Sequence, residues 1–373
     1  MNVLIAPDKF KSTLSASEVC DAIERGLINS GIPMMIRKFP LADGGEGTLD
    51  IFLLHASGKF VEVEVHDPLM RKIKSGYGLS SDGRIAFIEI ARASGLGLLK
   101  PEERNPLYTN TFGTGELIAD AISRNVEQII LGIGGSATND AAMGAALALG
   151  AKIMDKNGGE VLPTGKALAG INHFDLSVLN QKLSGIKLIA ICDVSNPFYG
   201  ETGAAYVYGP QKGAMTENIP VLEDGLRQVA EVIKSELGID LQNIPGSGAG
   251  GGFAGGAHAL FGAELKMGTD VVFDFTKFED ALAWADIVIT GEGKIDNQTL
   301  QGKLVHGVAQ KSFLAGKKVI AVCGISELER EDYNRIHLDR VFSLTTYAGT
   351  EASLKSCSTV LELLAQYELS NLK

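Results

Sequence analysis

Acidic residues and glycines are interleaved at residues 43–48 and could offer oxygen ligands beside flexible backbone. Gly44 and Gly45 lie between Asp43 and Glu46. Mg²⁺ prefers carboxylate ligands, and glycine lets the backbone approach a ligand closely. Acids at this spacing could instead complement the dipole of a helix that begins here. The segment therefore predicts either a site for a metal ion and a hydroxyl group or an acidic helix N-terminus.

A second segment, residues 291–296, adds a lysine to this pattern. Its glycine and charged positions are Gly291, Glu292, Gly293, Lys294 and Asp296. A lysine with two carboxylates suits a phosphate group that is bound together with Mg²⁺. The competing interpretation is an exposed turn that carries a solvated cluster of charges.

Polar residues also follow two apolar runs that have the character of strands. Asp8, Lys9 and Ser12 come after the apolar residues 3–6, and a lysine in that loop could hold an anionic substrate. Asp193 follows a later apolar run, and an acid at a strand end can serve as a general base. An ordinary solvated loop is the competing interpretation of each group, and it is stronger for the single acid Asp193.

A glycine turn at residues 132–140 fits the pattern GxGxxA. Its candidate binding residues are Gly134, Gly135, Ser136 and Asn139. Backbone N–H groups and a helix beginning behind the glycines would bind phosphate or carboxylate. Asp155 lies near the position of a ribose-binding acid, so an NAD-binding turn is an alternative. Polar residues follow the glycines where a Rossmann helix packs apolar side chains, which disfavours NAD.

A longer glycine tract, residues 246–256, has no bulky side chain before Phe253. It predicts either a backbone cradle for phosphates or a hinge between domains. The chain contains neither GxxxxGK[ST] nor GxSxG, so we expect neither a P-loop nucleotide site nor the nucleophile elbow of serine hydrolases.

The elements that must position these groups alternate between strand and helix at both ends of the chain. Two strand–helix units at the N-terminus and three at the C-terminus flank a mixed middle, in which residues 204–208 are predicted as a strand. We expect an α/β fold: a discontinuous Rossmann-like parallel-sheet domain, residues 1–60 and 281–373, with an inserted mixed α/β domain, residues 61–280. We expect the active site in the cleft between them, because ligands favour domain interfaces.

Composition excludes several functional classes. The 373 residues include 45 glycines, and the net charge of −11 disfavours a nucleic-acid or anionic-membrane binder. Four widely spaced cysteines, with no signal peptide, predict a cytoplasmic protein with reduced thiols. The longest uncharged run, residues 241–263, contains eight glycines and does not predict a membrane span.

Seven segments resemble signature segments of the bacterial glycerate kinase type-1 family. They are residues 6–12 (APDKFKS), 42–48 (ADGGEGT), 111–117 (TFGTGEL), 132–140 (GIGGSATND), 198–200 (FYG), 209–213 (GPQKG) and 289–296 (ITGEGKID). The resemblance implies an ATP- and Mg²⁺-dependent kinase that phosphorylates D-glycerate on its 2-hydroxyl, giving 2-phosphoglycerate and ADP. It also implies two α/β domains with the active site between them.

The resemblance suggests a role for each candidate residue. Lys9 and Lys294 would neutralise the transferred phosphoryl group, and Asp193 or Asp296 would accept the hydroxyl proton. Mg²⁺ would be held by one or two carboxylates from among Asp43, Glu46 and Glu292. The remaining candidates would bind phosphates or substrate: Asp8, Ser12, Gly44, Gly45, Gly134, Gly135, Ser136, Asn139, Gly291 and Gly293.

Three alternatives remain open at this point. The same kinase could form 3-phosphoglycerate, the glycine turn could serve an NAD-dependent dehydrogenase of a small hydroxy acid, or the chain could be a non-catalytic regulator that binds a sugar acid or a nucleotide.

Overall fold

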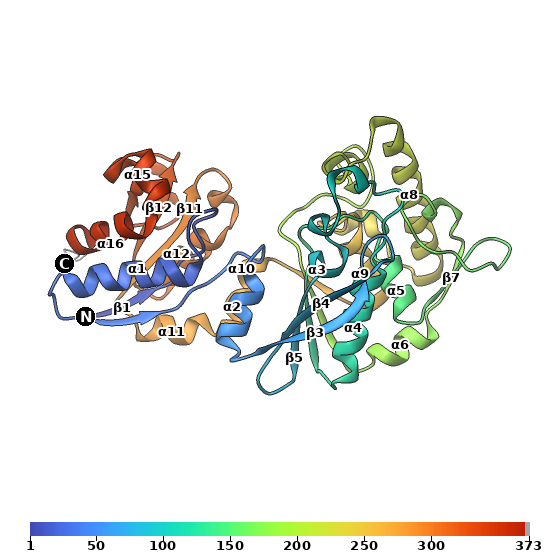
Figure 1. Ribbon diagram of the computed structural model, residues 1–373, viewed down its shortest axis with the longest axis horizontal. Helices are drawn as coiled ribbons and strands as arrows, with labels where there is room; N and C mark the ends of the chain where they lie inside the picture. The colour runs from blue at the N-terminus through green and yellow to red at the C-terminus, as the bar shows by residue number, and fades with distance from the viewer. Residues whose placement is uncertain (370–373) are drawn as a thin grey trace. The chain divides into compact units, whose positions relative to one another are not determined.

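The computed structural model describes residues 1–369 and divides the chain into two compact units (Figure 1). The first comprises residues 1–51 and residues from 268 onward, and the second comprises residues 52–267. The sequence predicted these divisions at 60/61 and 280/281. In the structure both divisions lie earlier in the chain. Phe52 already belongs to the second unit, where it stacks on Phe87 with ring centroids 5.6 Å apart. In addition, Phe273 packs in an apolar core of the first unit.

The first unit contains a five-stranded sheet in which every pairing is parallel, in the order β13-β12-β11-β1-β2. The strands are β1 (Asn2–Ile5), β2 (Met35–Lys38), β11 (Ile287–Ile295), β12 (Lys318–Ser326) and β13 (Arg340–Ser343). Its longer helices are α1 (Ala16–Asn29), α10 (Gly268–Thr276), α11 (Phe278–Trp284), α12 (Leu304–Leu314) and α16 (Cys357–Tyr367). The shorter ones are α13 (Arg330–Arg335), α14 (Leu344–Ala348) and α15 (Thr350–Lys355), while α2 (Thr48–His55) crosses the division.

Both faces of this sheet are covered, as the apolar strands require. Val3 and Ile5 face a core shared with α1 and α16, which pack against each other (Figure 1). Leu4 faces the opposite core, which α10, α11 and α12 complete. A capping box begins α1: Glu18 N donates to Ser15 Oγ at 3.3 Å, and Ser15 N donates to Glu18 Oε2 at 2.8 Å.

The second unit contains a mixed six-stranded sheet in the order β10-β9-β6-β5-β4-β3. Its strands are β3 (Lys59–His66), β4 (Lys72–Leu79), β5 (Ile85–Glu89), β6 (Gln128–Gly132), β9 (Lys187–Ile191) and β10 (Glu264–Lys266). Strands β3, β4 and β5 pair antiparallel, and β5, β6, β9 and β10 pair parallel. A separate antiparallel pair joins β7 (Lys152–Met154) and β8 (His173–Asp175). The α/β fold class, with one parallel and one mixed sheet, is confirmed.

The second unit's helices are α3 (Ala91–Ser94), α4 (Phe112–Ser123), α5 (Met143–Ala148), α6 (Ser177–Leu183), α7 (Ala204–Tyr208), α8 (Ile219–Leu237) and α9 (Phe253–Phe261). Short 3₁₀ turns are η1 (Leu96–Leu98), η2 (Pro101–Glu103), η3 (Leu168–Gly170), η4 (Pro210–Lys212), η5 (Thr216–Asn218), η6 (Leu241–Asn243) and, in the first unit, η7 (Thr299–Gln301). Within residues 1–369, no helix is long and apolar enough to cross a membrane.

Two predictions of local structure were wrong. Residues 204–208 form α7 rather than a strand, because Ala204 and Ala205 are buried side by side while Tyr206 and Val207 are exposed. That burial pattern has no two-residue period. Residues 291–294 were expected in a loop but lie inside β11, whose pairing with β12 continues to Ile295.

Candidate active site

The carboxylates of Asp8 and Glu292 are buried in the first unit, and both feel the charge of a third acid, Asp43. Asp8 follows β1, and Glu292 lies in β11; their exposed fractions are 6% and 8%. The two segments are neighbours because Asp8 N donates to the carbonyl of Gly291 at 2.8 Å. Burial raises the pKa of Asp8 to about 8, and the negative charge of Asp43 adds to the rise. These three acids therefore share one region at the carboxyl ends of the strands, as the parallel sheet predicts.

Glu292 has a hydrogen-bonded partner that the sequence did not suggest. Thr299 Oγ1 donates to Glu292 Oε1 at 2.7 Å. Burial raises the pKa of Glu292 to about 7, the bond from Thr299 opposes this rise, and the charge of Asp43 adds to it. A cation beside these carboxylates would offset their repulsion, so their chemistry fits a metal ion.

Glu46 does not join this buried group. Its side chain is 87% exposed, and its carboxylate lies 3.5 Å from Lys9 Nζ, which also donates to the Glu46 carbonyl. Among residues 1–369, no group of three or more His, Cys, Asp or Glu is arranged to hold a metal ion by itself. A metal ion in this region would take its other ligand atoms from water or from a bound substrate.

The other predicted residues of the first unit lie nearer the surface. Lys294 Nζ is 2.9 Å from Glu327 and 3.5 Å from Asp296, and its side chain is about half exposed. Asp296 is partly buried, and its Oδ1 accepts a hydrogen bond from Gln298 N at 2.9 Å. Ser12 is exposed.

The glycines predicted to bind ligands in the first unit have different surroundings. A Cβ at Gly291 would lie 2.2 Å from the carbonyl oxygen of Val322, so the contact between β11 and β12 alone requires glycine there. Gly293 lies in the same strand. Gly44 is buried, and the exposed Gly45 donates its N–H to Asp43 Oδ1 at 3.0 Å.

In the second unit, the glycine turn does not lead directly into a helix. Gly134 and Gly135 are exposed, and the chain then passes inward, so that Ser136 and Asn139 are buried. Helix α5 begins only at Met143. The expected helix N-terminus behind the glycines is therefore absent from residues 132–140. The polar groups of this segment are side chains held inside the unit.

Lys212 lies among these side chains, and sequence reasoning assigned it no role. It ends η4, is 2% exposed, and its Nζ donates to Ser136 Oγ at 2.8 Å and to the Thr138 carbonyl at 2.6 Å. Burial lowers its pKa to about 7, and the charge of Asp140 partly opposes this. One signal was available, because Lys212 is the only charged residue between Glu201 and Glu217.

Asp140 is also fully buried, and only one of its carboxylate oxygens has protein partners. Oδ2 accepts from Thr111 N and Thr111 Oγ1, both at 2.7 Å, and from Gly144 N at 3.1 Å. Burial raises its pKa to about 6 against the effect of these bonds. Within the described chain, Asp140 Oδ1 and both polar side-chain atoms of Asn139 have no hydrogen-bond partner. Buried polar atoms in native proteins are nearly always paired, so these atoms indicate a place where a water molecule or a ligand binds.

We call Ser136, Thr138, Asn139, Asp140 and Lys212 the Lys212 cluster. The glycine tract of residues 246–256 passes against it. Gly251 has φ +77°, and a Cβ there would lie 2.0 Å from the Thr138 carbonyl oxygen and 2.9 Å from Lys212 Nζ. The tract lies wholly inside the second unit, so it is not a hinge between the units. Its backbone instead packs directly on the cluster.

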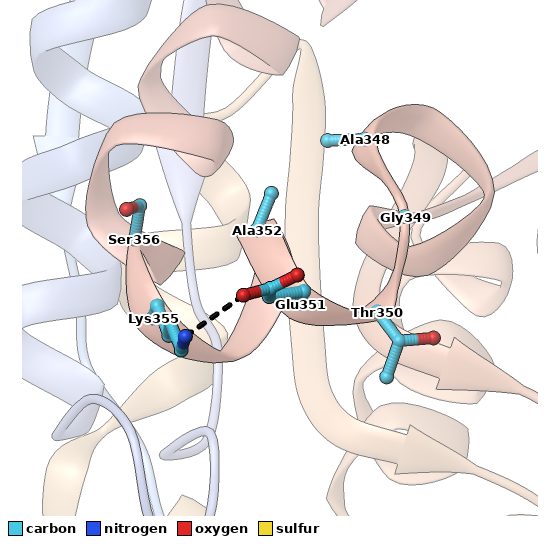
Figure 2. A pocket seen from close by; sticks show the side chains of 7 residues that line it. All are labelled: Ala348, Gly349, Thr350, Glu351, Ala352, Lys355 and Ser356. Atoms are coloured by element: carbon cyan, nitrogen blue, oxygen red, sulfur yellow. Dashed lines mark hydrogen bonds and ion pairs between the residues drawn. The ribbon is translucent and has the colours of Figure 1, made fainter.

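Asp193, the other predicted base, is exposed after β9 in the second unit, whereas Asp296 belongs to the first. An open hollow of about 480 Å³ lies beside α14 and α15 and contains none of the predicted residues. Its two charged residues, Glu351 and Lys355, pair with each other at 2.8 Å (Figure 2).

Comparison with known proteins identifies the family to which the chain belongs. The model of the glycerate kinase family matches residues 3–369. Glycerate kinase of Bacillus cereus is 41% identical, covering 98% of this chain and 96% of the relative. Glycerate 2-kinase of Escherichia coli is 42% identical, covering 94% and 92%. A solved structure of a Salmonella typhimurium LT2 protein described as glycerate kinase 2 has a TM-score of 0.89 at 43% identity, covering 98% and 96%. The chain belongs to the glycerate kinase family.

Proposed function

We propose that this protein transfers the γ-phosphoryl group of ATP to the 2-hydroxyl of D-glycerate, giving 2-phosphoglycerate and ADP. The observation that carries the proposal is the family match over residues 3–369. The choice of the 2-hydroxyl is supported by the Escherichia coli relative, which is named glycerate 2-kinase.

Phosphoryl transfer requires that the protein position the two substrates and stabilise negative charge on the transferred group. The glycerate hydroxyl oxygen bonds to the γ-phosphorus, and the bond from that phosphorus to the β,γ-bridging oxygen breaks. The hydroxyl proton passes to a carboxylate base, for which Asp193 and Asp296 are candidates. Lys9 and Lys294 would stabilise negative charge on the transferred group.

We propose that Mg²⁺ accompanies ATP. Asp43 and Glu292 would hold it, with Asp8 adjacent, because burial and the negative charge of Asp43 raise the pKa of both Asp8 and Glu292. Mg²⁺ in such sites is bound by one or two carboxylates together with substrate phosphates. When bound, it would neutralise charge on the phosphate oxygens. Glu46 fits this role less well, because it is exposed and paired with Lys9.

We also propose a cytoplasmic location. Cys20, Cys192, Cys323 and Cys357 are all buried free thiols, as expected in a reducing compartment.

An assay of nucleotide turnover tests the function. Purified protein is incubated with ATP and D-glycerate, with and without Mg²⁺, and ADP release is followed. A parallel sample contains NAD⁺ in place of ATP. We expect ADP release only when ATP, D-glycerate and Mg²⁺ are all present. Reduction of NAD⁺ to NADH in the parallel sample, with no ADP release in the first, would favour the dehydrogenase, and binding without turnover would favour the non-catalytic regulator.

A further inference from the structure

We propose that the Lys212 cluster binds the acceptor acid of the reaction: the Lys212 ammonium contacts its carboxylate, and Asp140 Oδ1 accepts a hydrogen bond from its 2-hydroxyl. This contact makes Asp140 a third candidate for the base, beside Asp193 and Asp296. The inference deepens the proposed function and rests on it for the identity of the acceptor, D-glycerate. It assigns Lys212 and Asp140 to the acceptor rather than to the nucleotide.

The ammonium of Lys212 is held with one N–H uncommitted. A lysine ammonium carries three donors, and two are used by Ser136 Oγ at 2.8 Å and the Thr138 carbonyl at 2.6 Å. Both acceptors are fixed in the inward-passing segment behind the glycine turn. The lysine therefore has a set orientation and one remaining donor for an anion.

The carboxylate of Asp140 is likewise held by one atom and has another that can accept a hydrogen bond from a ligand. Three hydrogen bonds fix Oδ2, and Oδ1 has no partner within residues 1–369. A carboxylate oxygen accepts hydrogen bonds, so its natural partner is a hydroxyl. The neighbouring residue Asn139 has both polar atoms of its buried amide without a partner within residues 1–369, so it adds an NH₂ group with two donors and one acceptor oxygen.

The charges of the Lys212 cluster favour a singly charged acid over the triphosphate of ATP. One ammonium and one carboxylate sum to zero, and the cluster contains no second cation. A ligand with a single negative charge and a neutral hydroxyl matches this set. The triphosphate of ATP carries several negative charges and would face Asp140 with only one compensating lysine. Because every member is 4% exposed or less, the site also suits a small molecule.

Calorimetric titration of the full-length protein tests the assignment. D-glycerate is titrated in the presence of a saturating non-hydrolysable ATP analogue with Mg²⁺, and the analogue is titrated alone. The variants are Lys212→Met, which keeps the length and loses the charge, and Asp140→Asn, which keeps the shape. Lys74→Met is the control, because Lys74 lies on β4 of the same unit with a 78% exposed side chain.

We expect Lys212→Met to weaken D-glycerate binding by roughly 10- to 150-fold and Asp140→Asn by about tenfold, as for hydrogen bonds to buried charged groups. The affinity for the ATP analogue should stay within about twofold of the wild-type value in both variants. Lys74→Met should change the affinity for neither ligand. Circular dichroism and thermal melting establish that each variant folds. Asp140→Asn keeps the proposal testable if Lys212→Met does not fold.

A ligand series separates the two contacts in the wild type. Glycerol lacks the carboxylate, and 3-hydroxypropanoate lacks the 2-hydroxyl. The preference for D-glycerate over glycerol should shrink about tenfold or more in Lys212→Met. The preference for D-glycerate over 3-hydroxypropanoate should decrease in Asp140→Asn.

Loss of analogue binding in Lys212→Met, with D-glycerate binding intact, would overturn the assignment in favour of a nucleotide site. Unchanged binding of both ligands in both variants would also overturn it and would indicate that the buried polar atoms are satisfied by structural water. If the wild type binds another 2-hydroxy acid through Lys212 but does not bind D-glycerate, the inference stands and the proposed function fails.

Discussion

Lys212 Nζ donates a hydrogen bond of 2.8 Å to Ser136 Oγ, a residue 76 positions away in the sequence. The bond ties the 3₁₀ turn η4 to the segment that follows the glycine turn after β6. Both side chains are buried. The contact brings a buried cation to the polar side chains for which the sequence had predicted anion binding.

The affinity for D-glycerate should fall as pH rises above neutrality. Burial lowers the pKa of Lys212 to about 7, so above that pH the free protein holds a neutral amine. Binding a carboxylate favours the ammonium, so each binding event must take up a proton at higher pH. We expect the affinity to fall by up to about tenfold per pH unit above pH 7.

Calorimetry in two buffers of different ionisation enthalpy measures this proton uptake directly. In Lys212→Met the proton uptake that Lys212 causes should be absent. The affinity of this variant for D-glycerate should also change less between pH 7 and pH 9. Equal affinity of the wild type at pH 7 and pH 9, with no proton uptake, would argue against a contact between Lys212 and the carboxylate.

Asp43→Asn should raise the Mg²⁺ concentration needed for half-maximal activity. The substitution removes one carboxylate from the buried acidic region of the first unit. We expect an increase of roughly tenfold or more, with little change in the KM for D-glycerate. Glu46→Gln is the control, and it should change the requirement by less than about twofold because Glu46 is exposed and paired with Lys9. The reverse ranking would assign Mg²⁺ to Glu46.

Gly251→Ala should destabilise the protein more than Gly238→Ala does. Both glycines have positive φ, +77° and +72°, which costs about 1–2 kcal/mol for alanine. A Cβ at Gly238 has nothing within 4 Å, whereas one at Gly251 meets the Thr138 carbonyl at 2.0 Å. We expect an extra loss of at least about 1 kcal/mol in the free energy of unfolding, measured in urea. Equal losses would show that the tract can move away from the Lys212 cluster.

Asp193→Asn and Asp296→Asn should separate the two candidate bases. Loss of a general base lowers kcat by about 10²- to 10⁴-fold, while binding of ATP stays normal. We expect this loss in one variant only. Near wild-type kcat in both would exclude both residues as the base and direct attention to Asp140, whose Oδ1 has no partner within residues 1–369.

Much of the fold could be predicted because its determinants are local. Val3, Leu4 and Ile5 are apolar on both faces of a strand, which predicts a sheet covered on both sides. Ser15 and Glu18 have the spacing of a capping box, a local pattern that predicts a helix N-terminus, and α1 begins there. Residues 204–208 were mistaken for a strand because their aromatic and β-branched residues favour strands, whereas the packing of Ala204 and Ala205 determines a helix.

The candidate site was only partly predictable, because its contacts span long stretches of sequence. The position of Asp8 after β1 follows from the alternation of strands and helices, whereas Glu292 lies inside β11, which is longer than the sequence indicated. The partners of Lys212 are 76 and 74 residues away, and no local pattern links them. The delayed start of α5 likewise turned an expected helix N-terminus into a set of buried side chains.

The position of the phosphoryl group on the product tests the central claim most directly. The protein is incubated with ATP, Mg²⁺ and D-glycerate, and the product is examined by ³¹P NMR with proton coupling. We predict 2-phosphoglycerate, in which phosphorus couples to the single proton on C2, and stoichiometric ADP. Formation of 3-phosphoglycerate, with coupling to the two protons on C3, or the absence of any phosphorylated product, would contradict the account.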